Sequence, residues 1–94
     1  MKILVTGATG FIGRRLVQML EDSGHQALVV TSADGDIADP EIFSRFRGSV
    51  LDHVFHLAGR TFVPDAWQEP AEFQRVNAMG TVNVLESCRA AKTP

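Results

Sequence analysis

The stretch Val5 to Gly13, with the sequence Val-Thr-Gly-Ala-Thr-Gly-Phe-Ile-Gly, decides how this chain folds. A short, mostly apolar run from Lys2 to Val5 precedes it, and an apolar pattern of helical spacing follows it directly. Glycine recurs at every third position, at Gly7, Gly10 and Gly13. This order of signals predicts a β-strand, a tight glycine turn and the first turn of an α-helix.

The glycine turn is expected to bind a phosphate group. Glycine adopts backbone angles that a Cβ atom would forbid, and it lets the main chain approach a pyrophosphate closely. The amides near Phe11 and Ile12 and the positive end of the helix dipole would face the anion, while Gly13 would let the helix pack tightly on its strand. An ordinary flexible turn is the alternative, but the strand and helix around it favour a nucleotide site.

The composition limits the classes of partner. The chain has 94 residues, enough for one small domain or a piece of a larger one, and its net charge of -2 gives no electrostatic reason to expect nucleic-acid or membrane binding. Cys88 is the only cysteine, which excludes an internal disulfide and favours a reducing cytoplasm. Met1 leads into the first strand without a charged leader, and no apolar stretch approaches membrane-spanning length. A cytoplasmic protein with a small-molecule partner is expected.

Two further strands are predicted after the glycine turn. Apolar residues at helical spacing continue to Leu20, and Gly24 is placed to end this helix. A second strand is expected from His25 to Thr31, and a third from Asp52 to Gly59. Right-handed crossovers make the strands parallel, and the spatial order second, first, third places the end of the third strand beside the glycine turn.

The second strand ends in the neutral sequence Thr31-Ser32-Ala33, and the nearest carboxylate, Asp34, lies beyond it. Folds that bind NAD commonly place an acidic residue here, where it hydrogen-bonds the ribose hydroxyls. A neutral strand end lacks the group that would repel a 2′-phosphate, so a strict preference for NAD is not expected. A preference for NADP does not follow either, and both cofactors remain candidates.

The segment Asp36-Ile37-Ala38-Asp39-Pro40 has two interpretations. As structure, Asp39 caps a short helix that starts at Pro40 and continues through Phe46. As function, Asp36 and the backbone of Ile37 border an adenine ring.

The third strand carries two histidines, His53 and His56. Residues three apart on a strand point to opposite faces, so these two are not expected to share a metal ion. Both are expected to have structural roles, and no metal site is predicted.

The small residues Ala58 and Gly59 at the end of the third strand would leave room for a cofactor. Residues 60 to 69 are expected to form an irregular loop on the side of the glycine turn, where substrate sites are commonly built. Thr61 is its best-placed polar candidate, with an exposed loop threonine as the alternative, and Trp67 is expected to anchor the loop.

A long helix is predicted from Pro70 to about Lys92. One stripe of this helix is mostly small or apolar and comprises Phe73, Asn77, Gly80, Val84, Cys88 and Ala91. Asn77 is its polar member, and a buried amide must find hydrogen-bond partners. Gly80 costs about 1 kcal/mol of helix propensity relative to alanine, which indicates that close packing compensates.

Together these features resemble the amino-terminal half of an extended short-chain dehydrogenase/reductase of the NAD(P)-dependent epimerase/dehydratase type. Four motifs carry the resemblance: Thr6-Gly7-Ala8-Thr9-Gly10-Phe11-Ile12-Gly13, Gly35-Asp36-Ile37-Ala38-Asp39, His56-Leu57-Ala58-Gly59, and Val76-Asn77 followed by Gly80-Thr81-Val82-Asn83-Val84-Leu85-Glu86. The resemblance implies an α/β fold, namely a partial Rossmann fold with a three-stranded parallel sheet and flanking helices, truncated before the catalytic helix. Residues 1–94 would be the amino-terminal part of an NAD(P)-binding Rossmann domain.

The resemblance also implies roles for individual residues. Those expected to line the pyrophosphate are Gly7, Gly10, Phe11, Ile12 and Gly13. Those expected beside the adenine are Asp36 and Ile37, and those beside the inner ribose are Leu57, Ala58 and Gly59. Asn77 would brace the active-site backbone, and Thr61 and Asn77 are the candidates for accessory catalytic roles.

Proton transfer in this family is carried by a tyrosine and by a lysine four residues later, on a later helix. This chain contains no tyrosine, and Lys92 lies at the end of the preceding helix. The resemblance therefore implies a truncated, catalytically inactive cofactor-binding half of an epimerase/dehydratase that acts on a nucleotide-sugar. The alternatives are a nucleotide-sugar reductase of the same superfamily, which the short segment before Asp36 favours, and a non-enzymatic NAD(P)-binding sensor.

A sheet that ends with the third strand leaves that strand unpaired along one edge, which makes it a template for association. The chain is therefore expected to be marginally stable or to self-associate near Val54 to Leu57. NAD or NADP and a small-molecule substrate, expected to be a nucleotide-sugar, are its other predicted partners.

Overall fold

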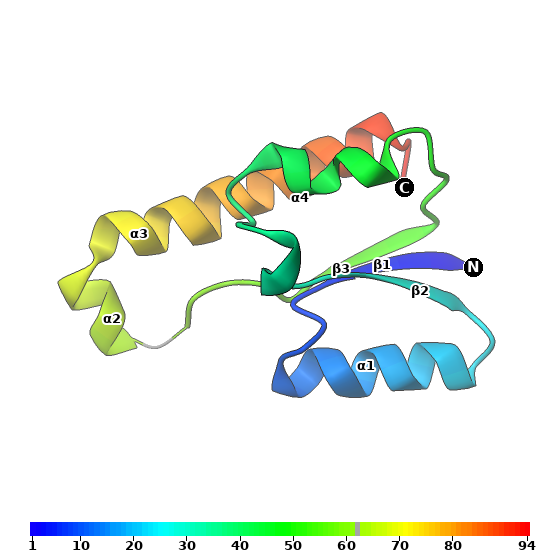
Figure 1. Cartoon of the computed structure of the whole chain (residues 1–94), viewed down its shortest axis with the longest axis horizontal. Coiled ribbons are helices and arrows are strands. Elements are labelled where there is room, and N and C mark those ends of the chain that lie inside the picture. Colours follow the sequence, from blue (N-terminus) through cyan, green and yellow to red (C-terminus); the bar gives the residue numbers. More distant parts are fainter. Residues whose placement is uncertain (62) are drawn as a thin grey trace.

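The computed structural model describes residues 1–61 and 63–94. A parallel sheet of three strands lies at its centre, with β1 (Lys2–Thr6), β2 (Gln26–Val30) and β3 (His53–His56) in the order β2-β1-β3 (Figure 1). This confirms the predicted fold class and strand order. β2 is shorter than predicted because Thr31 already caps the following turn.

The central strand β1 is paired on both sides. Leu4 aligns with Leu28 of β2 and with Val54 of β3. Helices cover both faces of the sheet, so the residues from Ile3 to Thr6 are all buried. The apolar run that precedes the glycine turn is thus the most deeply buried strand of the molecule.

Helices form a layer on each side of the sheet (Figure 1). Helix α1 (Phe11–Asp22) covers one face, and the 3-10 helix η2 (Pro40–Phe46) and helix α4 (Gly80–Ala90) cover the other. Because side chains alternate along a strand, the two faces of β1 belong to two apolar clusters. The cluster on the α1 side contains Ile3, Val5, Ala8, Leu16, Val17, Leu20 and Phe55. The opposite cluster contains Leu4, Val30, Phe43, Phe46, Leu51 and Val84.

Two predicted helix signals are confirmed. Asp39 caps η2, because its carboxylate accepts a hydrogen bond from the backbone N–H of Glu41 at 3.0 Å. Gly24 follows the end of α1 with a φ of +85°, a conformation that favours glycine. The short helix that begins at Pro40 is of the tighter 3-10 type.

The long helix predicted from Pro70 is present as three consecutive segments. These are α3 (Pro70–Gln74), a π-helical turn η3 (Arg75–Met79) and α4, which ends at Ala90. The π turn adds one residue to a single turn and so shifts the face presented on either side of it. Gly80 and Val84 of the predicted stripe are buried, but Asn77 is exposed and Asn83 is buried instead. Within the described residues, none of the helices is long and apolar enough to cross a membrane.

The prediction of an irregular loop over residues 60 to 69 is wrong in part. Val63–Gln68 form a helix, α2, in which Pro64 occupies the second position, where its missing N–H would have had no partner in the helix. Trp67 does not anchor this segment, since it is 85% exposed. Arg60 anchors it instead, through ion pairs with Asp65 at 3.4 Å and Glu69 at 3.1 Å. Phe62, within the predicted loop, lies outside the described residues.

Candidate functional site

The glycine turn joins the carboxyl end of β1 to α1 in very little space. Gly7 has a φ of +69°, and a Cβ atom there would lie 2.7 Å from the backbone nitrogen of Ala58. A Cβ atom on Gly13 would lie 2.1 Å from the carbonyl oxygen of Gly7. Both positions therefore require glycine for close contacts between segments of the chain itself.

Gly10 differs from the other two glycines because it is exposed. A Cβ atom there would meet only the carbonyl oxygen of Gly7, at 3.4 Å, which is ordinary van der Waals contact. Space in front of this residue is thus open to a ligand. The first hydrogen bond of α1 runs from the N–H of Arg14 to the carbonyl oxygen of Gly10 at 3.0 Å. The N–H groups of residues 11–13 therefore have no hydrogen-bond partner within the helix. With no acidic residue in this first turn, they form a site suited to an anion.

A cavity of about 480 Å³ opens at the carboxyl ends of the three strands. Seven of the residues predicted to bind a cofactor line it, namely Gly7, Gly10, Asp36, Ile37, Leu57, Ala58 and Gly59. Phe11, Ile12 and Gly13 do not line it: the first two are 84% and 66% exposed, and Gly13 is buried beneath Gly7. Other residues, to which sequence reasoning assigned no cofactor contact, also line the cavity, among them Thr9, Thr31, Ser32, Glu72, Arg75 and Val76.

Thr6, at the end of β1, fixes the backbone of two cavity residues. Its Oγ1 accepts hydrogen bonds from the N–H groups of Leu57 at 3.1 Å and Ala58 at 3.2 Å. The same oxygen lies 2.7 Å from Nδ1 of His56. Sequence reasoning quoted Thr6 in the first motif but gave it no role of its own, although a polar residue at the end of a buried apolar strand is a visible signal.

His56 is half-buried between β1 and α4. Its Nε2 lies 3.3 Å from Oγ1 of Thr81, and burial lowers the pKa of its imidazole below the usual range. His53 lies on the opposite face, with its ring 4.8 Å from that of Phe55, as predicted. Among residues 1–61 and 63–94, no group of three His, Cys, Asp or Glu side chains is arranged to bind a metal ion.

Asp36 lines the cavity and forms an ion pair with Arg75. Its Oδ1 accepts the N–H of Ala38 at 2.9 Å. The hydrogen bond from Ala38 and that from Arg75 lower the pKa of the Asp36 carboxyl, in that order of importance. Sequence reasoning missed Arg75, which is separated from Asp36 by 39 residues.

The end of β2 presents hydroxyl groups to the cavity. Thr31 and Ser32 line it, and Thr31 caps the 3-10 turn η1 (Ser32–Asp34). Asp34 ends this turn. Its carboxylate accepts the N–H of Thr31 at 2.8 Å and forms an ion pair with Arg45 at 3.0 Å. The nearest carboxylate after β2 is therefore already engaged within the protein.

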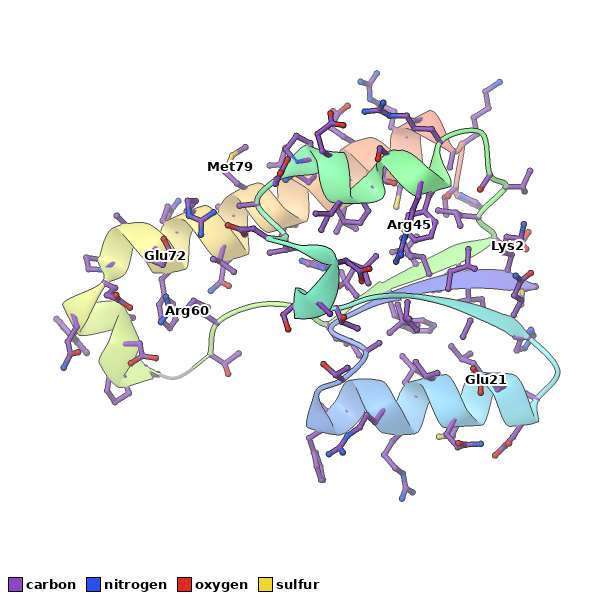
Figure 2. The ribbon with its side chains drawn as sticks, viewed as in Figure 1. Lys2, Glu21, Arg45, Arg60, Glu72 and Met79 are labelled. Carbon is purple, nitrogen blue, oxygen red and sulfur yellow. The ribbon has the colours of Figure 1, made fainter. Side chains whose placement is uncertain are left out.

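The two candidates for accessory roles lie outside the cavity lining. Thr61 is exposed in the segment between β3 and α2. Asn77 belongs to the π turn, and its side-chain amide contacts the backbone of Arg60. Figure 2 shows Arg60 between the segment that leaves β3 and the α2–α3 pair. Its guanidinium lies 5.3 Å from the ring centre of Phe73, which supports a cation–π contact.

A glycine turn between β1 and α1, at the carboxyl end of a parallel sheet ordered β2-β1-β3, defines a nucleotide-binding fold of the Rossmann type. The chain belongs to the NAD dependent epimerase/dehydratase family, whose model matches residues 3–94. It is 34% identical over 91 residues to the GDP-6-deoxy-D-mannose reductase of Pseudomonas aeruginosa, covering 95% of this chain and 30% of that protein. It is 37% identical over 89 residues to the dTDP-4-dehydrorhamnose reductase of Mycolicibacterium smegmatis, covering 95% of this chain and 27% of that protein.

Solved structures give the same assignment. The UDP-glucose 4-epimerase of Thermus thermophilus in complex with NAD superposes with a TM-score of 0.89 at 30% identity, over 99% of this chain and 35% of the epimerase. The UDP-glucose 4-epimerase of Thermotoga maritima with UDP-glucose gives a TM-score of 0.90 at 30% identity, over 99% of this chain and 35% of that chain. The chain thus spans about a third of the length of these relatives.

Proposed function

We propose that this chain is the NAD(P)-binding part of an epimerase or dehydratase that acts on a nucleotide-sugar. The observation that carries the proposal is the cavity itself, which runs from the open space before Gly10 to the Asp36-Ile37 segment. The anion site at the start of α1 adjoins the cavity at Gly10 and suits a pyrophosphate, and the part of the cavity lined by Asp36 and Ile37 suits an adenine.

Each part of a dinucleotide would meet a suitable group. The backbone at Gly7, Gly10 and the first amides of α1 would hold the pyrophosphate. Asp36 and Ile37 would flank the adenine, and the residues from Leu57 to Gly59, whose backbone Thr6 fixes, would lie against the inner ribose. The bound nicotinamide would supply hydride transfer, and this chain's own residues would bind and orient the cofactor.

A nucleotide-sugar reductase is the second candidate. The two curated relatives described above are named as reductases, and their names specify a GDP-linked and a dTDP-linked sugar. The neutral end of β2, with Asp34 engaged by Thr31 and Arg45, supports acceptance of NADP as well as NAD. The 94 residues contain no tyrosine, the residue that carries proton transfer in the family the sequence resembles. We therefore propose that the chain binds the cofactor without catalysing the reaction itself. We also propose that it does so in the cytoplasm.

Calorimetric titration of the 94-residue chain with NADH and with NADPH tests the binding proposal directly. The variant Gly10→Val fills the space in front of the turn, while the Cβ position is compatible with the protein's own packing. It is expected to abolish binding and leave thermal unfolding within a few degrees of the wild type. Gln18→Val introduces the same side chain at an exposed site of α1 and should bind normally. Unchanged affinity of Gly10→Val would remove the pyrophosphate assignment.

We also propose that the chain self-associates through β3. Among the described residues, β3 pairs with β1 on one side, and its other edge carries backbone groups that can pair with a second chain. Light scattering at increasing protein concentration should show a rising mass. A constant monomeric mass together with cooperative thermal unfolding would contradict this proposal.

A further inference from the structure

The hydroxyl of Thr6 connects the glycine turn to the end of β3. Thr6 is fully buried and directly precedes Gly7. Its oxygen accepts the N–H groups of Leu57 at 3.1 Å and Ala58 at 3.2 Å, and both of these residues line the cavity. A Cβ atom on Gly7 would lie 2.7 Å from the backbone nitrogen of Ala58, so the turn and the strand end are also in close contact. The position of the Thr6 oxygen therefore helps to set the spacing between these two parts of the cavity.

His56 supplies the acceptor for the hydroxyl proton of Thr6. A hydroxyl group has one proton and two lone pairs, and the amides of Leu57 and Ala58 occupy both lone pairs. Nδ1 of His56 lies 2.7 Å from the same oxygen and can accept the proton. A buried hydroxyl proton left without an acceptor is destabilising. The neutral ring thus completes the hydrogen bonds of Thr6 and fixes the direction of its lone pairs.

The other side of the ring is bound to the long helix. Nε2 of His56 lies 3.3 Å from Oγ1 of Thr81 on α4. That hydroxyl donates in turn to the carbonyl oxygen of Asn77 in the π turn at 2.6 Å. β3 pairs with β1 and packs against α4 (Figure 1). The ring is therefore held between two hydroxyl groups, with Nδ1 directed toward Thr6.

We propose that His56 is a positioning residue for the dinucleotide, an inference that rests on the proposed cofactor binding. His56 does not line the cavity. It acts through Thr6 on the backbone of Leu57 and Ala58, which would lie against the inner ribose. A ring protonated on Nδ1 brings a donor to an oxygen that has no free lone pair, so the oxygen must release one of its amides. The affinity for the dinucleotide therefore depends on the protonation state of His56.

The described part of the chain presents hydroxyl groups, rather than charges, to this ring. They come from β1 and from α4, and burial, not a neighbouring charge, lowers the pKa of the imidazole. The cavity's own ionisable groups keep their charges near neutral pH. A hydrogen bond from the backbone of Ala38 lowers the pKa of the Asp36 carboxyl, and one from Arg75 lowers that of Glu72. The hydrogen bond with Glu72 raises the pKa of Arg75 further above neutrality.

Two substitutions separate the two sides of the ring. Asparagine places its amide oxygen near the position of Nδ1, so His56→Asn retains an acceptor for Thr6. Glutamine places its amide near the position of Nε2, so His56→Gln retains a contact with Thr81 and loses that acceptor. Calorimetric titration of the 94-residue chain with NAD and with NADP at about pH 7.5 is the test. We expect His56→Asn to bind within about twofold of the wild type and His56→Gln about tenfold more weakly, as for the loss of one hydrogen bond.

The pH dependence of binding is the second measurement. The wild-type affinity should fall about threefold or more as the pH is lowered from about 7.5 to about 5.5, because the protonated ring competes for the oxygen of Thr6. His56→Asn cannot be protonated in this range and should show a flat profile. The matched control is His53→Gln, at an exposed position of the same strand, which should follow the wild type. Circular dichroism at each pH verifies that the chain is folded, and if one variant unfolds, the other variant and the wild-type profile decide.

The outcomes separate this inference from the proposed function. A wild type that binds neither NAD nor NADP overturns both. A wild-type affinity that does not change with pH overturns the role of His56 alone, as does wild-type affinity in His56→Gln. Equal weakening by both substitutions also overturns it, since the volume of the ring would then matter rather than its acceptor. Weaker binding by His56→Gln, with retained affinity and a flat profile in His56→Asn, supports it.

Discussion

The side chain of Asn77 holds the backbone of Arg60 at two points. Its Oδ1 accepts the N–H of Arg60 at 2.8 Å, and its Nδ2 donates to the carbonyl oxygen of the same residue at 2.9 Å. A Cβ atom on the preceding Gly59 would lie 3.1 Å from this Oδ1, so the main chain passes close to the amide. The π turn is thereby tied to the backbone that leaves β3 beside the cavity.

Replacing Asn77 by alanine should loosen this connection. Two hydrogen bonds to the backbone are lost at a partly solvated site, for an expected cost of about 1–2 kcal/mol in the free energy of unfolding. Urea unfolding measures this change, and hydrogen exchange at the amide of Arg60 should accelerate. The control is Gln18→Ala, which removes an exposed side-chain amide whose partner is Asp22 on the same helix. A loss no larger than that of the control would show that the contact with Arg60 adds nothing.

Gly80→Ala is predicted to destabilise the chain although alanine is the better helix former. The gain of about 1 kcal/mol in helix propensity is opposed by a Cβ atom 2.9 Å from Cγ2 of Ile37. Ile37→Ala removes the obstructing atoms, so in that background Gly80→Ala should become stabilising by about 1 kcal/mol. Chemical unfolding of the two single variants and the double variant measures the sign change. The same sign in both backgrounds would contradict the role assigned to Ile37.

The parts of the fold that sequence predicted well have local causes. The glycine turn, the cap at Asp39 and the stop at Gly24 depend on backbone angles and on hydrogen bonds within a few residues. The right-handed crossovers between strands predicted a parallel sheet, and the strand order was predicted from the doubly wound fold that the motifs resemble. Such features need no knowledge of distant contacts.

The parts that sequence did not predict depend on pairs far apart along the chain. The hydroxyl of Thr6 meets the amides of Leu57 and Ala58 at a separation of about 50 residues, and Arg75 meets Asp36 at a separation of 39. No periodicity encodes these pairings. They follow only once β1, β3 and the long helix are placed together.

The long helix shows why its buried face was only partly predicted. A stripe drawn at regular helical spacing assigned Asn77 to the core, but the π turn Arg75–Met79 changes the register. Asn83 is the buried amide instead, and its side chain donates a hydrogen bond to the carbonyl oxygen of Ile37. The helix α2 was missed because six residues with a proline give a weak periodic signal.

His56 is locked in one tautomer by the groups around it. The hydroxyl of Thr81 donates to the carbonyl oxygen of Asn77 at 2.6 Å, so it can accept from Nε2–H of His56. Nδ1 then accepts from the hydroxyl of Thr6, whose oxygen already accepts two backbone amides. A proton on Nδ1 would bring a further donor to an oxygen without a free lone pair.

This arrangement predicts a loss of stability in acid. Burial lowers the pKa of His56 in the folded chain below its unfolded value of about 6.5, so the unfolded state binds the proton first. The stabilising effect of the neutral ring is complete above about pH 6.5 and declines as the pH falls below it. Thermal unfolding between about pH 5 and pH 8 measures this slope. His56→Gln should flatten the part of the slope below about pH 6.5, whereas His53→Gln, at an exposed position of the same strand, should retain it. Parallel pH profiles for the wild type and His56→Gln would show that acid destabilises the chain through other groups.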